Sequence, residues 1–455
     1  MKLSRSSIVD TSRSLPELKF EDQQLTSFSG LVVFQELFAK LQLRDRLQDC
    51  FKHLAVAPIF GHARIVMLLM VHVLLGYRRL GELRYYKDDP QVARTLKLTR
   101  LPDATTVSRS LAMLDGHSVL ELRGVCRTLV LERLEQLRLA RVTVDFDGSV
   151  IGTCRYAEGT AIGYNKKKKG QRSYYPLFCT VAQTGQVLDV WHRPGNVHDS
   201  HGAREFIQAC LQAIRRVLPH AVLEARMDSA FFSDEILTAL NELDVRFTVS
   251  VPFERFTELK DKITARTRWR TLSRTVSYFE SDWKPKCWEK RLRFVFLREH
   301  TPLQRKEPIQ LDLFTPHEYG YQFKVIVTNT TLSAGKVLRL HNGRGAQEGL
   351  FAELKSHAAL DYIPARRLCA NQTWLLAVLL AHNLNRELQM QACEPQRATT
   401  DQRAPLWSFT RLATLRRHLL HRAGRFTRPQ GKLTLTLTPN DAVEDDLMRY
   451  LKRAA

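Results

Sequence analysis

The feature that most constrains the fold is a change in the hydrophobic period at Arg141. From about Leu31 to Leu137, apolar side chains recur three and four positions apart, which is typical of packed helices. After Arg141, RVTVDFD reads as a strand, and YPLFCTVAQTGQVLDVWHRPG reads as two more strands joined by a Thr-Gly turn. The sequence therefore predicts a helical part followed by a part that contains a sheet.

The segments that follow predict an α/β sheet. HGAREFIQACLQAIRRVL is a helix for which Asp199 and Ser200 are expected to form the cap, and SDEILTALNEL is a helix with Ser233 as its cap. VLEARMD and VRFTVSVPF are strands, so the order is three strands, helix, strand, helix, strand. From about Glu254 to Thr330 this alternation stops, and a segment rich in aromatics and cations predicts a β-rich insertion.

These changes divide the chain into three regions. We expect an all-α N-terminal domain over residues 1–140 and an α/β domain over 141–390, with the insertion at about 254–330. Residues 391–455 form a basic C-terminal segment that could serve dimerisation or DNA contact, and its stretch RHLLHRAGRFTRPQGKLTLTLTP is expected to be tail-like. Within the first region, LPDATTVSRSL is a helix entry that would carry Arg109 towards a phosphate backbone, although a capped surface helix explains it almost as well.

The charge balance indicates a polyanionic partner. There are 69 Lys and Arg residues against 47 Asp and Glu residues, a net charge of +22, which favours nucleic acid or an anionic membrane. The longest apolar run, Ile65 to Tyr77, is interrupted by His72 and is shorter than the roughly 20 residues that cross a bilayer. It predicts a buried helix, so we expect no membrane partner. Neither a secretion signal nor zinc-ligand cysteine spacing is present, and a cytoplasmic protein is expected.

Two aspartates stand where predicted strands end. Asp147 lies in VDFDGSV and Asp228 in ARMDSAFFS. Catalytic groups of open α/β sheets gather at the carboxyl ends of strands, and carboxylates gathered there can hold metal ions. Each aspartate could instead be an ordinary turn residue.

A third group of polar residues lies in HNGRGAQEGLFAELKSH. At about 100° per residue, a continuous helix places His341, Arg344, Glu348 and Lys355 on one stripe. An apolar face beside that stripe can dock the helix on the sheet, and consists of Leu350, Phe351 and Leu354. A solvated salt-bridge pattern is the alternative interpretation.

At this point the sequence resembles the DDE transposases of bacterial insertion sequences. The spacing His-x2-Arg-x3-Glu-x6-Lys is similar to the Tyr-x2-Arg-x3-Glu-x6-Lys signature of that family. DFDGS, GYNKKKKGQRSYYPLF, HRPGN and RMDSAFF resemble the other family blocks in the same order, over about Arg141 to Glu387. His341 departs from the signature, which puts in doubt the contact that the Tyr hydroxyl would make.

The resemblance implies a ribonuclease-H-like catalytic domain preceded by a DNA-binding domain. It implies that Asp147, Asp228 and Glu348 are the catalytic residues and hold two Mg²⁺ ions, for which Mn²⁺ can substitute. Asp145 is a neighbour of Asp147 or an occasional substitute for it. The implied reaction is binding of terminal inverted repeats, DNA cleavage, and joining of the ends to target DNA.

Further residues are candidates for contact with double-stranded DNA. Arg344 and Lys355 would hold phosphates beside the metals. The remaining DNA-binding candidates are His341, Arg109 and the basic run Lys166, Lys167, Lys168 and Lys169. A hairpin intermediate would require a base to leave the stack, and Trp269, Trp283 and Trp288 could stack on such a base. The alternative for the lysine run is a solvated basic loop, and the alternative for the tryptophans is packing in the core of the insertion.

Two transposon ends must be processed together, so we expect a homodimer on DNA, acting at the bacterial nucleoid. The C-terminal region with the apolar helix TWLLAVLLAHNLN is the expected contact surface, although that helix could equally be core. Two other functions remain open. A ribonuclease-H-like nuclease or resolvase would cut without joining, and a non-catalytic DNA-binding derivative would not cut at all.

Overall fold

The structure is a computed structural model, and it describes residues 17–163, 165, 168–300, 320–397 and 406–454. The region after Arg141 builds one nine-stranded mixed sheet in the order β10-β11-β12-β13-β9-β8-β2-β6-β7. Five of its strands are β2 (Arg141–Gly148), β6 (Leu177–Val181), β7 (Gln186–Trp191), β8 (Val222–Met227) and β9 (Arg246–Ser250), and β7 lies at one edge of the sheet. β2 is parallel to β8 and β8 to β9, whereas β6 is antiparallel to β2. The predicted order of strands and helices in this region is confirmed.

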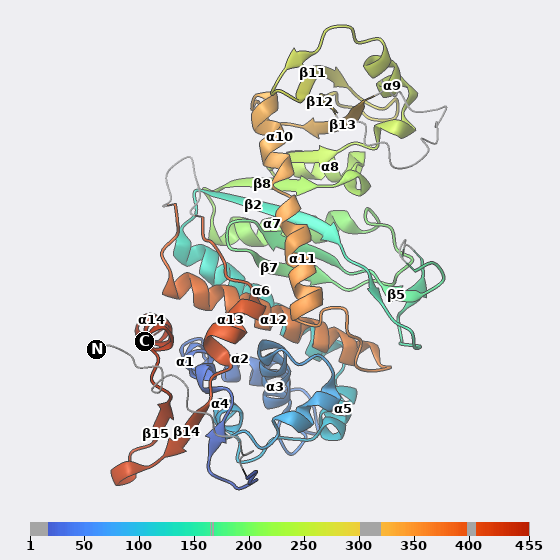
Figure 1. The fold of residues 1–455 in the computed structure, drawn as a ribbon. Helices are drawn as coiled ribbons and strands as arrows, with labels where there is room; N and C mark the ends of the chain where they lie inside the picture. The colour runs from blue at the N-terminus through green and yellow to red at the C-terminus, as the bar shows by residue number, and fades with distance from the viewer. Residues whose placement is uncertain (1–16, 164, 166–167, 301–319, 398–405, 455) are drawn as a thin grey trace, which may run out of the picture.

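Residues 254–330 extend this same sheet. After α9 (Thr257–Thr264) come β10 (Arg270–Thr271), β11 (Val276–Trp283), β12 (Leu292–His300) and β13 (Tyr321–Thr328). β13 pairs antiparallel with β9, so the four strands continue the edge of the sheet (Figure 1). A second, smaller sheet that we did not predict lies between β2 and β6 in the chain. Its strands are β3 (Ile151–Gly152), β4 (Ala161–Ile162) and β5 (Arg172–Tyr174).

The two helix caps predicted in this region have different outcomes. Ser233 accepts a hydrogen bond from the Ile236 backbone N–H and caps α8 (Asp234–Glu242), as expected. The cap expected from Asp199 and Ser200 is wrong, because α7 (Ala203–Val217) begins after Gly202, whose φ of 63° lies in the left-handed region. Asp199 therefore belongs to the loop before α7 and is free to serve another purpose.

The region before Arg141 is helical. Its helices are α1 (Val32–Lys40), α2 (Leu43–Asp49), α3 (His62–Leu75), α4 (Pro90–Thr95), α5 (Ala104–Ala112) and α6 (Gly116–Leu137). α3 is buried along almost its whole length, which confirms the interpretation of its apolar run as a core helix. The Asp103 carboxylate accepts a hydrogen bond from the Thr106 N–H at 2.7 Å, so the predicted start of α5 is also confirmed.

The C-terminal region is not tail-like, and this expectation is wrong. α12 (Leu368–Ala392) runs beneath the sheet, and the described residues after it form α13 (Leu412–Leu415), β14 (Gly424–Thr427), β15 (Thr434–Leu437) and α14 (Asp441–Ala454) (Figure 1). Val443, Leu447 and Tyr450 of α14 are buried in the same hydrophobic core as α1, α3 and α12. Local patterning missed this arrangement because its contacts lie hundreds of residues away in the chain.

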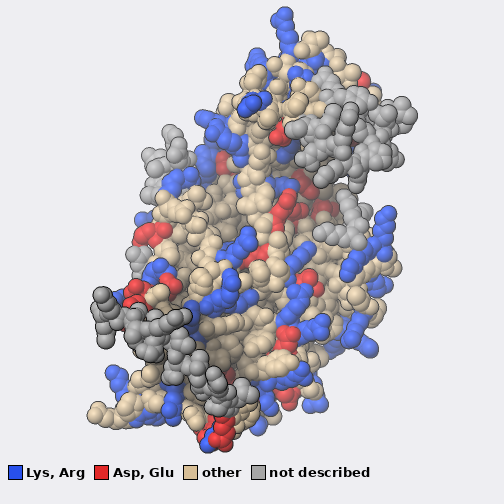
Figure 2. Space-filling view, in the orientation of Figure 1, with Lys and Arg blue, Asp and Glu red and all other residues tan. Residues whose placement is uncertain are grey.

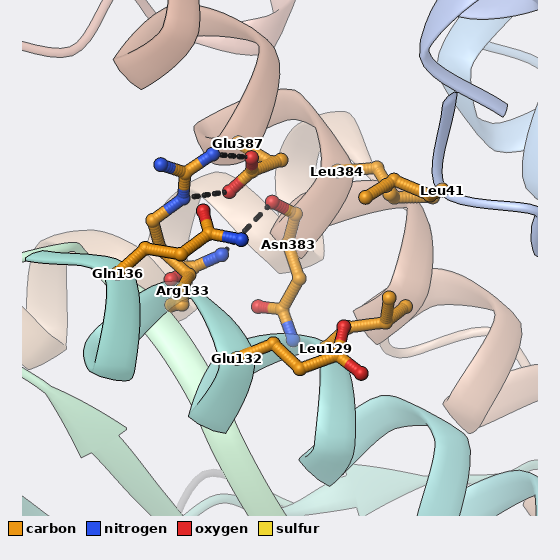
Figure 3. A pocket seen from close by; sticks show the side chains of 9 residues that line it. Leu41, Leu129, Glu132, Arg133, Gln136, Asn383, Leu384 and Glu387 are labelled. Carbon is orange, nitrogen blue, oxygen red and sulfur yellow. Dashed lines mark hydrogen bonds and ion pairs between the residues drawn. The ribbon is translucent and has the colours of Figure 1, made fainter. Parts of the chain in front are cut away.

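α12 is a core helix, and of the two alternatives considered for it the structure favours this one. Nearly all of its side chains are buried, including those of Trp374, Leu380 and Asn383. On one side an ion pair joins Glu387 to Arg133 of α6, beside a small cavity between the two helices (Figure 3). In the part of the chain that the structure describes, no helix is long and apolar enough to cross a membrane.

Arg416 ties three regions together and generates a prediction about stability. Its buried guanidinium donates to the carbonyl oxygens of Leu74 at 2.7 Å, Val73 at 2.5 Å and His357 at 2.5 Å. We expect Arg416→Leu to lower the free energy of unfolding by about 3 kcal/mol, because buried acceptors lose their donor. Urea denaturation followed by circular dichroism measures this change. Arg417→Leu at the neighbouring exposed position is the control, and equal losses in both variants would contradict the assignment.

Candidate active site

The carboxyl ends of two parallel strands bring two carboxylates together. Asp147 is the penultimate residue of β2, and Asp228 directly follows β8. Phe146 and Met227 are paired in register, so the aspartates that follow them emerge at the same edge of the sheet. One Asp147 oxygen accepts the Gly148 N–H at 2.8 Å, and one Asp228 oxygen accepts the Ala230 N–H at 2.9 Å.

Burial and mutual repulsion make these carboxylates hard to ionise. Burial, and next the negative charge of Asp228, raises the pKa of Asp147 to about 7 against the opposing effect of Arg344. Burial also raises the pKa of Asp228. A divalent cation would relieve the repulsion, and carboxylate oxygens are the ligands that Mg²⁺ prefers. The donor set therefore fits a hard metal ion.

Asp145 is committed to another partner. Its two oxygens accept from Nε and an Nη atom of Arg226, both at 2.6 Å, and both side chains are buried. The residues are register partners across β2 and β8. This bidentate ion pair fastens the two strands directly before Asp147 and Asp228, so Asp145 supports the edge rather than facing it.

The helix expected to begin at His341 is divided in two. α10 (Ala334–Asn342) and α11 (Gly345–His357) are separated at Gly343 and Arg344, although the two helices follow each other closely in Figure 1. A Cβ atom on Gly343 would lie 2.1 Å from an Nη atom of Arg226, so glycine is needed there. The Asp145–Arg226 pair thus also sets the space available at the junction of the helices.

His341 does not share the exposed stripe that a continuous helix predicts, and that expectation is wrong. Its side chain is 2% exposed and lies within hydrogen-bond distance of the Ser250 hydroxyl at 2.9 Å and the Thr248 hydroxyl at 3.2 Å. Both partners lie on β9, so His341 fastens α10 to the sheet. In this arrangement its ring is not available to DNA.

α11 presents Glu348 from the other side of the edge. The predicted apolar face is confirmed, since Leu350, Phe351 and Leu354 are buried. The Gln347 amide donates to the Asp145 carbonyl at 3.2 Å, which joins the start of α11 to β2. The side chain of Glu348 is 68% exposed and free to turn.

Arg344 lies between the carboxylates. One Nη atom is 3.2 Å from Asp147, and the other is 3.5 Å from Glu348. Among the described residues, no three acidic, His or Cys side chains are spaced to hold a metal ion. Arg344 is therefore the counter-ion of Asp147 and Glu348 in this conformation. The Glu348 side chain would have to turn for the three carboxylates to come together.

A groove of about 560 Å³ begins beside Asp147 and is lined by Ser149, Lys168, Tyr175 and Lys355. The Lys355 ammonium donates to the Val150 carbonyl at 3.0 Å, which holds the end of this side chain against the loop that follows β2. Figure 2 shows acidic side chains gathered beside α10 and α11, with Lys and Arg side chains spread over the surrounding face. The surrounding Lys and Arg side chains would attract a polyanion towards the acidic residues.

The other predicted DNA-binding residues are dispersed. Lys168 and Lys169 are exposed beside the groove, whereas Lys166 and Lys167 lie outside the described residues. Arg109 is exposed on α5, in the helical part and away from the sheet edge (Figure 1).

The three tryptophans pack within the extension of the sheet. Trp283 and Trp288 are each 7% exposed and belong to the hydrophobic core. Trp269 is partly exposed, lies edge-on to Phe279, and has the Arg298 guanidinium 4.6 Å above its ring. Of the three, only Trp269 has a surface that a base could reach without rearrangement.

Sequence reasoning missed a third aspartate near this edge. Asp199 accepts the Tyr175 hydroxyl at 2.7 Å and lies 3.3 Å from an Nη atom of Arg193. Its charge contributes to the raised pKa of both Asp147 and Asp228. HRPGN had been noted as a block, but the aspartate after it was interpreted as a helix cap.

Several solved structures show a distant similarity to this chain. The piggyBac transposase synaptic complex with hairpin DNA is similar at 9% identity and a TM-score of 0.41, over 86% of this chain and 80% of that one. The Mos1 transposase paired-end complex with left transposon end is similar at 13% identity and a TM-score of 0.18, over 36% of this chain and 56% of that one. The Drosophila P element transposase strand transfer complex is similar at 13% identity and a TM-score of 0.22, over 47% of this chain and 42% of that one. No curated protein matches the sequence.

Two carboxylates meet at one edge of a mixed sheet, and a further carboxylate lies on an adjoining helix within a basic surface. This arrangement is typical of enzymes that transfer phosphoryl groups. The family model for the transposase DDE domain group 1 matches residues 10–454, and the chain belongs to this family of DDE transposases. It is an enzyme that cleaves DNA and joins the cut strands, and members of the family work with divalent metal ions.

The burial of His341 generates a prediction about pH dependence. Burial, with smaller contributions from Lys324 and Arg344, lowers the pKa of His341 to about 3. The folded state keeps the ring neutral, so its contribution to stability is complete above the unfolded pKa of about 6.5 and is lost as the pH falls towards 3. Between pH 6 and 4, we expect wild type to lose up to about 1.4 kcal/mol per pH unit more than His341→Gln. Urea unfolding at several pH values measures the difference, and parallel profiles would rule out the buried neutral ring.

Proposed function

We propose that this transposase cuts and rejoins the ends of a bacterial insertion sequence, with Asp147, Asp228 and Glu348 as the ligands of two Mg²⁺ ions. The observation that carries the proposal is the pairing of β2 with β8, which brings Asp147 and Asp228 to one edge of the sheet. There burial, and next the charge of Asp228, raises the pKa of Asp147 to about 7. The resemblance to insertion-sequence transposases supports the choice of element and a site of action at the bacterial nucleoid.

A ribonuclease-H-like architecture is part of this proposal. The strand order β7-β6-β2-β8-β9, in which β6 alone runs against the other four, supports it. In such a sheet the first and fourth strands in chain order lie side by side, and these are the strands that carry Asp147 and Asp228.

The roles of the residues follow from where they lie. When bound, the two ions would activate the attacking water or 3′-hydroxyl and stabilise the leaving oxygen. Asp147 and Asp228 would hold the cations at the edge of the sheet, and Glu348 would turn in from α11 to complete the set. Arg344 would leave its carboxylate partners and grip a DNA phosphate, because the incoming cations replace it as their counter-charge.

Several basic residues have an exposed position suited to binding the rest of the DNA. Lys355 and Lys168 line the groove beside Asp147, and Lys169 is exposed next to Lys168. The groove would hold the backbone that leads to the scissile phosphate. We propose that the helical region before Arg141, with Arg109 exposed on α5, recognises the terminal repeats.

The triad is tested by separating cutting from binding. We expect Asp147→Ala, Asp228→Ala and Glu348→Gln each to abolish strand cleavage in Mg²⁺ while gel shifts with end DNA stay within about twofold of wild type. The reason is that metal ligation and DNA binding use different residues.

Two controls sharpen this test. Glu353→Gln changes a glutamate on the same helix that is bound to Arg386, so it reports on damage to α11 without touching the edge of the sheet. Wild-type cleavage by any one of the three triad variants would remove that residue from the site.

We propose in addition that two copies act together, because two ends have to be cut in concert and one triad serves one end at a time. Mixing Arg109→Glu, which should bind ends poorly, with Glu348→Gln, which should bind but not cut, tests this arrangement. We expect cleavage to recover in the mixture to about a quarter or more of the wild-type rate if each chain acts on the end that its partner holds. Neither variant alone should cut. The arrangement would be contradicted if the mixture did not recover cleavage and if wild-type protein cut a single end at its full rate as a monomer.

A further inference from the structure

The loop between β7 and α7, residues 192–202, is built around a buried arginine. The side chain of Arg193 is 1% exposed. It donates to the carbonyl oxygens of Tyr175, His198 and Asp199 at 3.2 Å each. Its guanidinium also lies 5.3 Å from the ring centre of Trp191. With this many contacts the loop has little freedom, so the direction of Asp199 is fixed by the fold.

Tyr175 fixes the same carboxylate from the other side. Its hydroxyl donates to one Asp199 oxygen at 2.7 Å. Burial, and next the charge of Asp199, raises the pKa of Tyr175, so the hydroxyl stays protonated and remains a donor. The orientation of the Asp199 side chain is therefore fixed by one phenol and one guanidinium.

Gly148 shows how close this pair lies to the catalytic edge. A Cβ atom built on Gly148 would lie 2.5 Å from an Asp199 oxygen and 2.5 Å from the Tyr175 ring. Gly148 is the residue directly after Asp147 in β2, so the Asp199 carboxylate rests against the backbone that carries Asp147. The lack of a side chain at position 148 is what makes this approach possible.

The two oxygens of a carboxylate can accept about four hydrogen bonds in all. One Asp199 oxygen accepts Tyr175, and the other lies 3.3 Å from Arg193. Acceptor capacity is thus left over on a carboxylate that is already oriented. Groups of this kind hold the water molecules or ligands around a metal ion and tune its affinity.

We propose that Asp199 is a positioning residue of the catalytic site, a fourth carboxylate that stands behind the proposed ligands and strengthens cation binding through the waters around the ions. This inference rests on the proposed metal site at Asp147 and Asp228. The geometry assigns Tyr175 and Arg193 to the support of Asp199, and through it to the same task.

The test measures metal binding directly, in full-length protein without DNA. We expect Asp199→Asn to weaken Mn²⁺ binding about tenfold by calorimetry, as losses in the surroundings of a metal site do, with a melting temperature close to that of wild type. Tyr175→Phe keeps the ring against Gly148 and removes only the donor, so we expect a smaller weakening in the same direction.

A matched control removes an equally buried aspartate. Asp189 on β7 is paired with Arg123 and Arg127 of α6, and is not among the groups that shift the pKa of Asp147 or Asp228. Asp189→Asn should leave Mn²⁺ affinity unchanged. If it weakens binding as much as Asp199→Asn does, the effect is general and the inference is overturned.

The remaining outcomes separate this inference from the proposed function. Asp147→Ala and Asp228→Ala must lose Mn²⁺ binding, and wild-type affinity in both would refute the metal site itself. If these two lose binding while Asp199→Asn binds like wild type, only the role of Asp199 is refuted. Should Asp199→Asn fail to fold, Tyr175→Phe decides: weaker binding supports the inference, and unchanged binding overturns it.

Discussion

Repulsion between two carboxylates at one sheet edge is the constraint on which the rest of this structure depends. Parallel pairing of β2 with β8 forces Asp147 and Asp228 together in a partly buried place, where neither ionises easily. An isolated pair of this kind opposes folding at neutral pH, because the folded state has to ionise groups that it disfavours. Its neighbours compensate. The Asp145–Arg226 ion pair locks the strands, and Arg344 supplies positive charge.

The second requirement is a stiff support for the third carboxylate. α11 is held at its start by the hydrogen bond from Gln347 to the Asp145 carbonyl of β2, and at its end by two arginines from other regions. Arg78 donates to the Lys355 carbonyl at 3.1 Å, and Arg416 donates to the His357 carbonyl. The last carbonyls of a helix have no partners within it, so these guanidinium groups take the place of a cap. Glu348 thus stands on a helix that links the sheet to the helical region, and the C-terminal region completes the link.

Much of this could be read from the sequence, and the failures have a common cause. The strand that carries Asp147, the existence of helix α7 and the Ser233 cap are local features, and each was predicted correctly, although α7 begins later than expected. His341 was misplaced because a helical wheel assumes an unbroken helix, whereas Gly343 interrupts it to admit Arg226, a residue over a hundred positions earlier. The packing of α14 and the setting of Asp199 depend in the same way on partners that only the tertiary fold brings near.

Two kinds of positive charge can stand beside these carboxylates, namely the Arg344 guanidinium and the proposed metal ions. An arginine cannot lose its charge, so the guanidinium between Asp147 and Glu348 offsets part of their negative charge for as long as it stays there. In the proposed site, divalent metal ions would carry twice that charge and bind the carboxylate oxygens, while a DNA phosphate would be a bidentate partner for the displaced arginine. Each binding event would then favour the other, because metal would release Arg344 and phosphate would receive it. On this proposal Arg344 offsets part of the acidic charge in the absence of metal, and the metals would bind most readily when DNA is present to take the arginine.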